Sequence, residues 1–313
     1  MRVYLTGGSG FVGSNVARVF ETHGAELAAP GHRQVDVTDA DAVRSSVAAF
    51  RPDAIVHCAI LNDFAALYAN RGAAWDAYVG ATRNLVDAAN GAGARIVLVS
   101  TDWVFDGTQS GATERTPTNP INLYGFLKAA SELVLGERAE RGSVARVAAV
   151  QGSPSRAAGS GIGRGLPREQ DAGFGYFVST LVERLRARER FAVWESDDVN
   201  MVATPTLASN AAELMWRILE RDLDGIFHCC GGESVDRRTL AIRAAQVFEL
   251  DPTLLDLGVR PPDGALPGPE GGPPAAVPYD TSLDATWTAT ELDVQLPNVT
   301  EMLHRMCEEL ALA

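Results

Sequence analysis

The sequence has few cysteines, and they show no pairing pattern. Cys58, Cys229, Cys230 and Cys307 form no CxxC pair and have no spacing with histidine that would assemble a tetrahedral metal site. The pattern argues against a zinc module or a disulfide framework. We therefore expect buried free thiols and no metal site.

Long apolar runs and an excess of positive charge are also missing. No run approaches the roughly 20 apolar residues that a membrane span needs, and the start MRVYLTGGSG has none of the regions of a secretory signal. The net charge of -13 repels phosphate backbones and anionic lipid surfaces. The one dense basic stretch, 183–190, carries its own acids. We expect a cytoplasmic protein without nucleic-acid or membrane partners.

What the sequence does contain is an alternation of strand-like and helix-like segments. Apolar runs predict strands at 2–6, 26–30, 54–59, 95–100 and 144–150. Apolar residues at helical spacing predict helices at 11–24, 39–50, 73–93 and 123–142. Asp39 is a typical helix N-cap, and Gly24 and Gly93 are typical C-terminal stops. The alternation predicts an α/β fold with a Rossmann-type doubly wound parallel sheet.

The composition changes after residue 152. Residues 153–175 are rich in glycine, serine and arginine and predict a long loop, which is either an active-site lid or a linker. Further helices near 176–188, 206–220, 236–249 and 299–311, with strands at 191–195 and 225–230, suit a smaller lobe. We predict a dinucleotide-binding domain at 1–152. Residues 153–313 would mainly form a substrate-binding α/β lobe, with some segments returning to the first domain.

A glycine-rich turn, TGGSGFVG, lies between the first predicted strand and the first predicted helix. Gly7, Gly10 and Gly13 would allow a tight turn, close approach of the backbone to a pyrophosphate and close packing of the helix on the sheet. The amide groups at the helix N-terminus favour negative charge there. The context predicts a dinucleotide cofactor.

The stretch after the second strand, AAPGHRQVDV at 28–37, indicates which dinucleotide. An NAD-type site usually places an acid here, but there is none between Glu26 and Asp36. Arg33 instead falls where a cation could meet a 2′-phosphate. We predict that NADP(H) is preferred and NAD(H) possible. The alternative is that Arg33 is only a surface charge.

Tyr124 and Lys128 stand four residues apart and so share one helix face. A phenol is a poor acid at neutral pH, and a nearby ammonium is expected to draw its pKa down. Tyr124 could then give a proton to a carbonyl oxygen and take it back in the reverse direction. Thr101, at the end of the run RIVLVST, would hold the same oxygen.

Several segments together resemble the extended short-chain dehydrogenase/reductases. They are TGGSGFVG, HCA at 57–59, STDWVFDG at 100–107, PINLYGFLKAASE at 120–132 and VPYDTSLD at 277–284. The dTDP-4-dehydrorhamnose reductase branch is the most similar, and ATPTLASNAAELM at 203–215 resembles its substrate-lobe motif. The resemblance implies an NAD(P)H-dependent reductase of a keto group on a nucleotide-activated deoxysugar. It also implies a homodimer formed through the helices at 73–92 and 123–141.

The resemblance also assigns roles to residues. Thr101, Tyr124 and Lys128 are then catalytic, and Asp102, Trp103 and Phe105 border the sugar. The residues implied to bind the cofactor are Gly7, Ser9, Gly10, Phe11, Val12, Gly13, Arg33, Asp36, Val37, Cys58, Ala59, Ile60, Tyr124 and Lys128.

The sequence departs from the family pattern in places that affect the substrate. Tyr78 replaces a helix asparagine of many relatives, which puts any proton relay or helix distortion that depends on it in doubt. The run RVAAVQG at 146–152 lacks the usual aromatic residues. Arg156, Arg164 and Arg168 in the long loop could clamp a diphosphate, or could be solvated charges.

Two other functions stay open at this point. One is an epimerase or dehydratase that keeps its nicotinamide bound and recycles it. The other is a non-catalytic, NADP-binding regulatory protein, because the β subunit of methionine adenosyltransferase resembles the same branch. Retention of Thr101, Tyr124 and Lys128 does not exclude the regulatory function.

Overall fold

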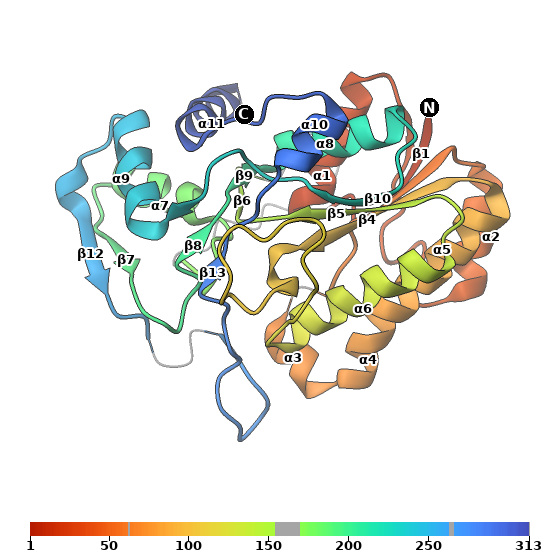
Figure 1. Cartoon of the computed structure of the whole chain (residues 1–313), viewed down its shortest axis with the longest axis horizontal. Coiled ribbons are helices and arrows are strands. Elements are labelled where there is room, and N and C mark those ends of the chain that lie inside the picture. Colours follow the sequence, from red (N-terminus) through yellow and green to blue (C-terminus); the bar gives the residue numbers. More distant parts are fainter. Residues whose placement is uncertain (62, 154–169, 263–265, 313) are drawn as a thin grey trace.

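A six-stranded parallel sheet forms the larger half of the molecule (Figure 1). The computed structural model describes residues 1–61, 63–153, 170–262 and 266–312. The strands are β1 (Arg2–Thr6), β2 (Glu26–Ala28), β3 (Ala54–His57), β4 (Arg95–Thr101), β5 (Gly142–Val147) and β10 (Gly225–His228). Their order, β10-β5-β4-β3-β1-β2, confirms the predicted doubly wound α/β fold. Because β2 and β3 lie on opposite sides of β1, the order of successive strands reverses there, and such a point is where open parallel sheets bind ligands.

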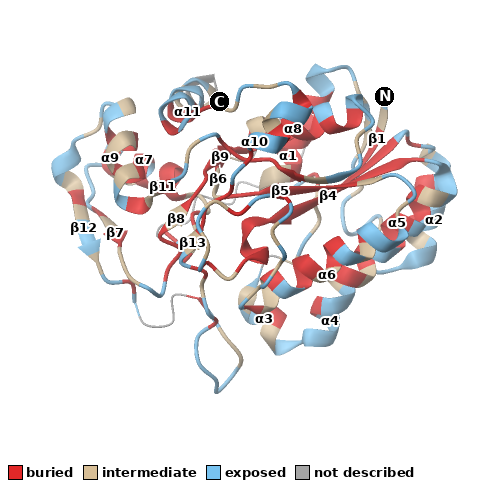
Figure 2. Ribbon diagram, viewed as in Figure 1, coloured by how far each residue is buried: buried red, intermediate tan, exposed pale blue. Residues whose placement is uncertain are grey.

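The sheet is buried on both faces because its strands carry apolar side chains in both directions. On β1, Val3 and Leu5 face one side and Tyr4 the other, and all three are buried. Helices α1 (Phe11–Thr22) and α8 (Ala208–Glu220) cover the first face, and α2 (Ala40–Phe50), α5 (Ala81–Ala92) and α6 (Leu123–Arg138) cover the second. Figure 2 shows the buried sides of these helices turned toward the sheet.

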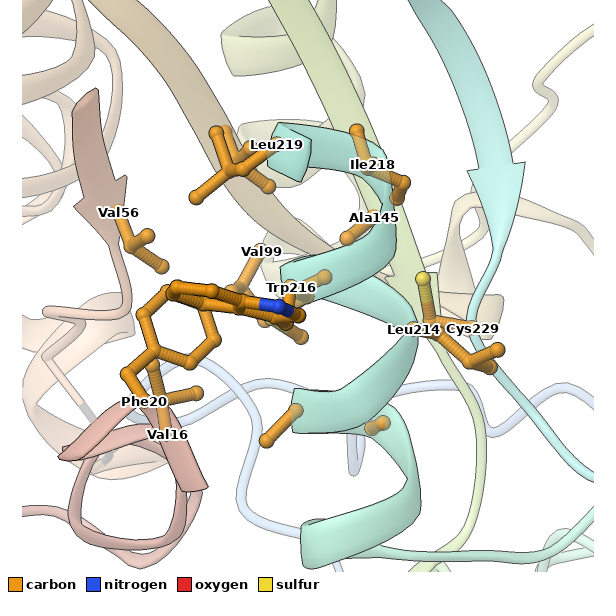
Figure 3. Packing of buried hydrophobic residues seen from close by; sticks show 14 of the residues in the cluster. Val16, Phe20, Val56, Val99, Ala145, Leu214, Trp216, Ile218, Leu219 and Cys229 are labelled. Carbon is orange, nitrogen blue, oxygen red and sulfur yellow. The ribbon is translucent and has the colours of Figure 1, made fainter. Parts of the chain in front are cut away.

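Figure 3 shows the core beneath α1 and α8. Phe20 and Trp216 meet edge to face, with ring centroids 5.1 Å apart. Val56, Val99 and Ala145 reach them from three neighbouring strands. Because α8 and β10 both follow residue 153, the second half of the chain completes the sheet and one of its covering layers.

The smaller lobe has its own core and lies at the left of Figure 1. Its helices are α7 (Phe177–Arg186), α9 (Arg237–Val247) and α11 (Val299–Leu312). Its strand pairs and short sheets are β7 (Phe191–Trp194) with β12 (Leu255–Val259), β8 (Val202–Ala203) with β11 (Val235–Asp236) and β13 (Asp280–Thr281), and β6 (Val150–Gln151) with β9 (Thr206–Leu207). The described helices include none long and apolar enough to cross a membrane. The cytoplasmic location stays a prediction.

Helix boundaries follow the local signals in most places. The Asp39 carboxylate accepts hydrogen bonds from the amides of Asp41 and Ala42 and caps α2. Gly24 and Gly93 adopt positive φ values of 76° and 65° after their helices, as predicted. The helix predicted at 73–93 is instead divided into α4 (Arg71–Trp75), a π-helical turn η1 (Asp76–Gly80) and α5. Short helices α3 (Phe64–Ala69) and α10 (Thr286–Leu292) were not predicted.

Candidate active site

A cleft of about 1370 Å³ lies at the carboxyl ends of β1, β3 and β4. Its far wall comes from residues 171–176 and 266–267, next to the smaller lobe. Most of the residues predicted from the sequence line it, namely Gly7, Ser9, Gly10, Phe11, Val12, Gly13, Asp36, Val37, Cys58, Ala59, Ile60, Thr101, Asp102, Trp103, Tyr124 and Lys128. One cleft therefore contains both the glycine-rich turn and the predicted reaction centre.

The glycine-rich turn has no room for side chains at two of its three marked positions. Gly7 has a φ of +69°, and a Cβ there would lie 2.6 Å from the Ala59 nitrogen. A Cβ on Gly13 would lie 2.1 Å from the Gly7 oxygen. The turn thus brings β1, β3 and the start of α1 into direct backbone contact, as a dinucleotide-binding turn requires.

The start of α1 is suited to an anion. Gly10 is its N-cap, and no side chain of the described residues caps the helix or adds a carboxylate to its first turn. The first amide groups of a helix lack intrahelical acceptors, and the helix dipole places partial positive charge beside them. These residues fit the pyrophosphate of a dinucleotide, which would lie against this turn.

Arg33, which was predicted to bind the cofactor, and its neighbour His32 are placed differently with respect to the cleft. Arg33 is exposed and is absent from the described lining of the cleft, whereas its neighbour His32 lines it. Asp36 accepts hydrogen bonds from the Thr38 amide and hydroxyl, which hold the pKa of its carboxyl below the usual range. The position of Arg33 gives no direct support for a 2′-phosphate contact.

Lys128 is buried beneath the cleft on α6. Its ammonium donates a 2.7 Å hydrogen bond to the Val99 carbonyl oxygen. Burial lowers the pKa of Lys128 to about 8, against the opposing influence of Cys58 and Glu132. Burial also raises the pKa of the neighbouring Cys58 thiol to about 12. The ammonium is therefore the charged member of this pair at neutral pH.

Tyr124 lies one helical turn before Lys128, but its electrostatics correct the sequence-based expectation. Burial raises the pKa of Tyr124 to about 12, and a hydrogen bond with the Thr101 hydroxyl offsets only part of that effect. The nearby Asp102 raises the pKa further, and Lys128 is not among the groups that lower it. Without ligands, Tyr124 is therefore a protonated phenol at neutral pH and not a phenolate.

Three aromatic rings surround the Tyr124 ring. Ring centroids lie 5.6 Å away for Phe64, 6.0 Å for Trp103 and 6.2 Å for Tyr78. Phe64 and Trp103 also line the cleft. The reacting hydroxyl therefore sits in a largely apolar surrounding, where hydrogen bonds and charges act strongly.

Tyr78 lies in the π-helical turn η1, so the helix distortion is present without an asparagine. Its hydroxyl donates a 3.0 Å hydrogen bond to the Leu61 carbonyl oxygen. The Lys128 ammonium lies 5.6 Å from the centre of the Tyr78 ring. Tyr78 thus borders both Tyr124 and Lys128 with its ring, while its polar atom points elsewhere.

Asp102 follows β4 and is buried at the edge of the cleft. The Thr101 hydroxyl donates a 3.0 Å hydrogen bond to its Oδ1, and the Thr281 hydroxyl donates a 2.5 Å hydrogen bond to its Oδ2. Burial raises the pKa of Asp102 to about 6, and these hydrogen bonds oppose the rise. This carboxyl group connects the predicted reaction centre with the C-terminal segment.

Phe105 does not border the cleft, which corrects the prediction. It is 1% exposed, lies edge to face against His228 and packs under the Arg146 guanidinium. The short 3-10 helix η2 (Asp102–Val104) turns the chain, so that Trp103 faces the cleft while Phe105 enters the core. The arginines predicted as a diphosphate clamp, Arg156, Arg164 and Arg168, lie outside the described residues.

Sequence reasoning missed several residues that shape the site. Phe64 and Tyr176 line the cleft, and Asn200 and Thr281 stand behind Asp102. Thr281 lies in VPYDTSLD, a segment that carried the resemblance without an assigned role, so a signal existed. Phe64 has no comparable local signal. Within the described residues, no group of three or more His, Cys, Asp or Glu side chains is placed to hold a metal ion.

Comparison with known proteins agrees with this arrangement. Residues 1–312 match the family model described as RmlD substrate binding domain. Methionine adenosyltransferase 2 subunit beta of Rattus norvegicus is 28% identical over 256 residues, covering 80% of this chain and 72% of the relative. The dTDP-4-dehydrorhamnose reductase of Streptomyces griseus is 33% identical over 154 residues, covering 49% and 51%.

A solved structure shows the same fold. The crystal structure of dTDP-4-dehydrorhamnose reductase from Bacillus anthracis, in complex with NADP, superposes with a TM-score of 0.81 and 22% identity, covering 98% of this chain and 99% of that chain. The match of the family model along almost the whole chain decides the assignment. This chain belongs to the RmlD substrate binding domain family, within the extended short-chain dehydrogenase/reductases.

Proposed function

We propose that this protein is an NADP(H)-dependent reductase of a keto group on a nucleotide-activated deoxysugar. One observation supports this most directly: Thr101, Tyr124 and Lys128 line the same cleft as the Gly7–Gly13 turn. The family and the relatives named dTDP-4-dehydrorhamnose reductase support the substrate class. The bound nicotinamide would supply the hydride for the reduction.

The chain's own residues would handle the proton. The Tyr124 hydroxyl would donate its proton to the carbonyl oxygen as that oxygen gains negative charge. The Thr101 hydroxyl would donate a hydrogen bond to the same oxygen. The Lys128 ammonium, fixed by the Val99 carbonyl, would stabilise the phenolate left behind. The raised pKa of Tyr124 keeps its proton in place until the substrate arrives.

The direct test is NADPH oxidation with dTDP-4-dehydrorhamnose. We expect turnover that falls by about 10²- to 10⁴-fold in Tyr124→Phe, because only the acid is removed. Binding of NADPH should change little in this variant, which separates loss of chemistry from loss of the fold. Equal rates in both proteins, or no turnover of any keto-sugar nucleotide, would argue against a reductase.

The preference for NADP(H) can be tested separately. If Arg33 meets the 2′-phosphate when the cofactor is bound, Arg33→Ala should weaken NADPH binding and leave NADH binding unchanged. His32→Ala is the matched variant, because His32 already lines the cleft. If only the His32 variant loses NADPH affinity, the preference would rest on His32 and not on Arg33.

A regulatory function is the second candidate, favoured by the similarity to methionine adenosyltransferase 2 subunit beta over 80% of this chain. It predicts that the purified chain binds NADP(H), turns over no sugar nucleotide and forms a complex with a methionine adenosyltransferase. A third possibility, an epimerase or dehydratase, predicts cofactor that stays bound through purification and activity without added NADPH.

The proposed homodimer interface would include exposed apolar side chains on α6 and α4. Phe126 and Leu133 lie seven residues apart on α6 and are 53% and 68% exposed, and Trp75 on α4 is 45% exposed. Phe126→Glu together with Leu133→Glu should convert a dimer to a monomer in analytical ultracentrifugation. Leu257→Glu, at an exposed leucine of β12, is the control and should leave the mass unchanged.

A further inference from the structure

The carboxyl group of Asp102 is buried and belongs to the lining of the cleft. It is 4% exposed, and no lysine, arginine or histidine of the described residues forms an ion pair with it. Its side-chain partners are the hydroxyls of Thr101 and Thr281. A buried carboxylate without a cation is costly, so this environment favours the neutral acid.

The hydrogen bonds behind Asp102 favour the same form. The Asn200 amide nitrogen donates to the Pro278 carbonyl at 2.9 Å and the Tyr279 carbonyl at 3.2 Å, which fixes the orientation of the amide. Its Oδ1 therefore faces the Thr281 hydroxyl, at 3.3 Å, as an acceptor. Thr281 has one proton but two neighbouring acceptors, Asn200 Oδ1 and Asp102 Oδ2.

A proton on Asp102 resolves this shortage of donors. Asp102 Oδ2 then donates to Thr281, and Thr281 donates to Asn200, so that each acceptor has a hydrogen. We propose that Asp102 works as a neutral carboxylic acid, held in that form by Thr281 and Asn200, and that this frees the Thr101 hydroxyl to turn to the substrate oxygen. Asp102 is thus a positioning residue for the proposed reduction, and this part of the inference rests on the proposed function.

The effect on Thr101 follows from the strength of its hydrogen bonds. The single Thr101 proton points to Asp102 Oδ1, so it is not available to the Tyr124 oxygen or to a substrate oxygen while that bond is kept. A carboxylate would hold that proton in a charge-assisted bond, about twice as strong as the bond to a neutral acid. Ionisation of Asp102 would therefore keep the Thr101 hydroxyl hydrogen bonded to Asp102 instead of to the substrate. It would also add negative charge beside the Tyr124 phenol.

Among the residues that the structure describes, two other titratable groups face Asp102. They are Tyr124 on α6 and Cys230, which follows β10, and the pKa of each is raised by burial and by Asp102. Both stay neutral through the range in which Asp102 titrates. Since the pKa of Asp102 is about 6, the change should fall between about pH 5 and pH 7.

The first test needs no substrate. In pH-difference infrared spectra, the wild-type protein should show the C=O band of a protonated carboxylic acid that disappears between pH 5 and pH 7. Asp102→Asn should lack this band. The matched control is Asp171→Asn, at another carboxyl of the cleft whose pKa is also raised, in which the band that titrates with Asp102 should persist. A band that is unchanged in Asp102→Asn would overturn the proposal.

Thermal unfolding gives a second readout. The folded-state pKa of Asp102 is raised, so its contribution to stability is present at low pH and is lost as pH rises from about 4 to about 6. Relative to Asp102→Asn, the Tm of the wild type should fall by about 5 °C between pH 4.5 and pH 7.5. A constant difference across this range would contradict a neutral Asp102.

Activity then tests the role of Asp102 in the reaction. In the wild type, kcat/KM for keto-sugar reduction should fall about tenfold between pH 6 and pH 7.5, and Asp102→Asn should lack this fall. Asn200→Ala should move the fall to lower pH, because Thr281 can then give its proton to Asp102. If no sugar nucleotide is reduced at all, the proposed function fails while the infrared and thermal results still decide the protonation of Asp102.

Discussion

Among the described residues, Arg146 and Arg237 are at most 1% exposed, one in each half of the molecule, and they are bound in different ways. In the sheet, Arg146 on β5 pairs with the Glu132 carboxylate of α6 through hydrogen bonds of 3.0 and 2.7 Å. In the smaller lobe, Arg237 at the start of α9 donates to backbone carbonyls, including those of Asn200 at 2.7 Å and Ala172 at 2.9 Å.

The two arginines have different partners because the backbone around them differs in how fully it is hydrogen bonded. Around Arg146 the backbone is already hydrogen bonded within the sheet and α6, so the charge is balanced by a side chain. Around Arg237, the irregular segment 170–173 has carbonyl groups that no strand or helix satisfies, and the guanidinium supplies the donors. Arg237 thereby fixes the cleft wall at Asp171–Gly173, whereas Arg146 joins two regular elements.

The largest effect should come from breaking the ion pair in the sheet. Arg146→Met leaves the buried Glu132 carboxylate without its ion-pair partner, and we expect a loss of about 3–5 kcal/mol in the free energy of unfolding. Urea denaturation would measure it. In the double variant with Glu132→Leu the charge is also removed, so most of the loss should be recovered. A double variant as unstable as the single one would show that Glu132 is not the reason for the loss.

Breaking the arrangement in the smaller lobe should cost slightly less. Arg237→Met leaves several backbone carbonyls without donors, and we expect a loss of about 2–4 kcal/mol, accompanied by weaker ligand binding at the 171–176 wall. No second side-chain deletion should rescue it, because the acceptors are backbone atoms. Rescue by Gln170→Leu, which removes the side-chain acceptor of Arg237, would contradict this explanation.

Lys128 combines the two arrangements, because it lies in the sheet half but donates to a backbone carbonyl. Its folded-state pKa is lowered to about 8, so its charged form disfavours folding below that pH and the penalty disappears as pH rises toward 10.5. Relative to Lys128→Met, the wild type should therefore gain about 2 kcal/mol of stability between pH 7.5 and pH 9.5. A difference that is flat with pH would place the ammonium in a more solvated environment.

The smallest losses of stability should come from removing a helix cap, and each half of the molecule offers one. Asp39 caps α2 and Asp236 caps α9, each by accepting hydrogen bonds from the first turn of its helix. We expect Asp39→Ala and Asp236→Ala to lose about 1 kcal/mol each, because both caps are local and partly solvated. A much larger loss for Asp236 would indicate that it also orients the adjacent Arg237.

The sheet half could be predicted closely because its signals are local. The apolar runs placed all five of the strands that were expected there, and the glycine-rich turn and the Tyr124–Lys128 spacing marked one cleft. The sixth strand was predicted at 225–230 but assigned to the smaller lobe. Its pairing with β5 depends on a contact about 80 residues away along the chain, which no local pattern reveals.

The remaining parts of the site depend on burial rather than on spacing. The sequence shows that Tyr124 and Lys128 share a helix face, but it does not show that burial raises the pKa of the phenol. Phe105 was assigned to the sugar because it lies in STDWVFDG, yet the η2 turn directs it into the core. Thr281 contacts Asp102, and Asn200 contacts Thr281, from segments about 180 and 100 residues distant from Asp102 in the chain.

The position of β10 has a consequence for how the protein is made. Until residue 228 has been synthesised, β5 remains an open edge with unpaired amide and carbonyl groups, and one sheet face lacks α8. A nascent chain that contains only the first five strands therefore exposes both an edge and an apolar surface suited to aggregation. Residues 208–228 thus complete and cover the sheet formed by residues 2–147, and a ribosome-bound intermediate that ends before them should depend most on chaperones.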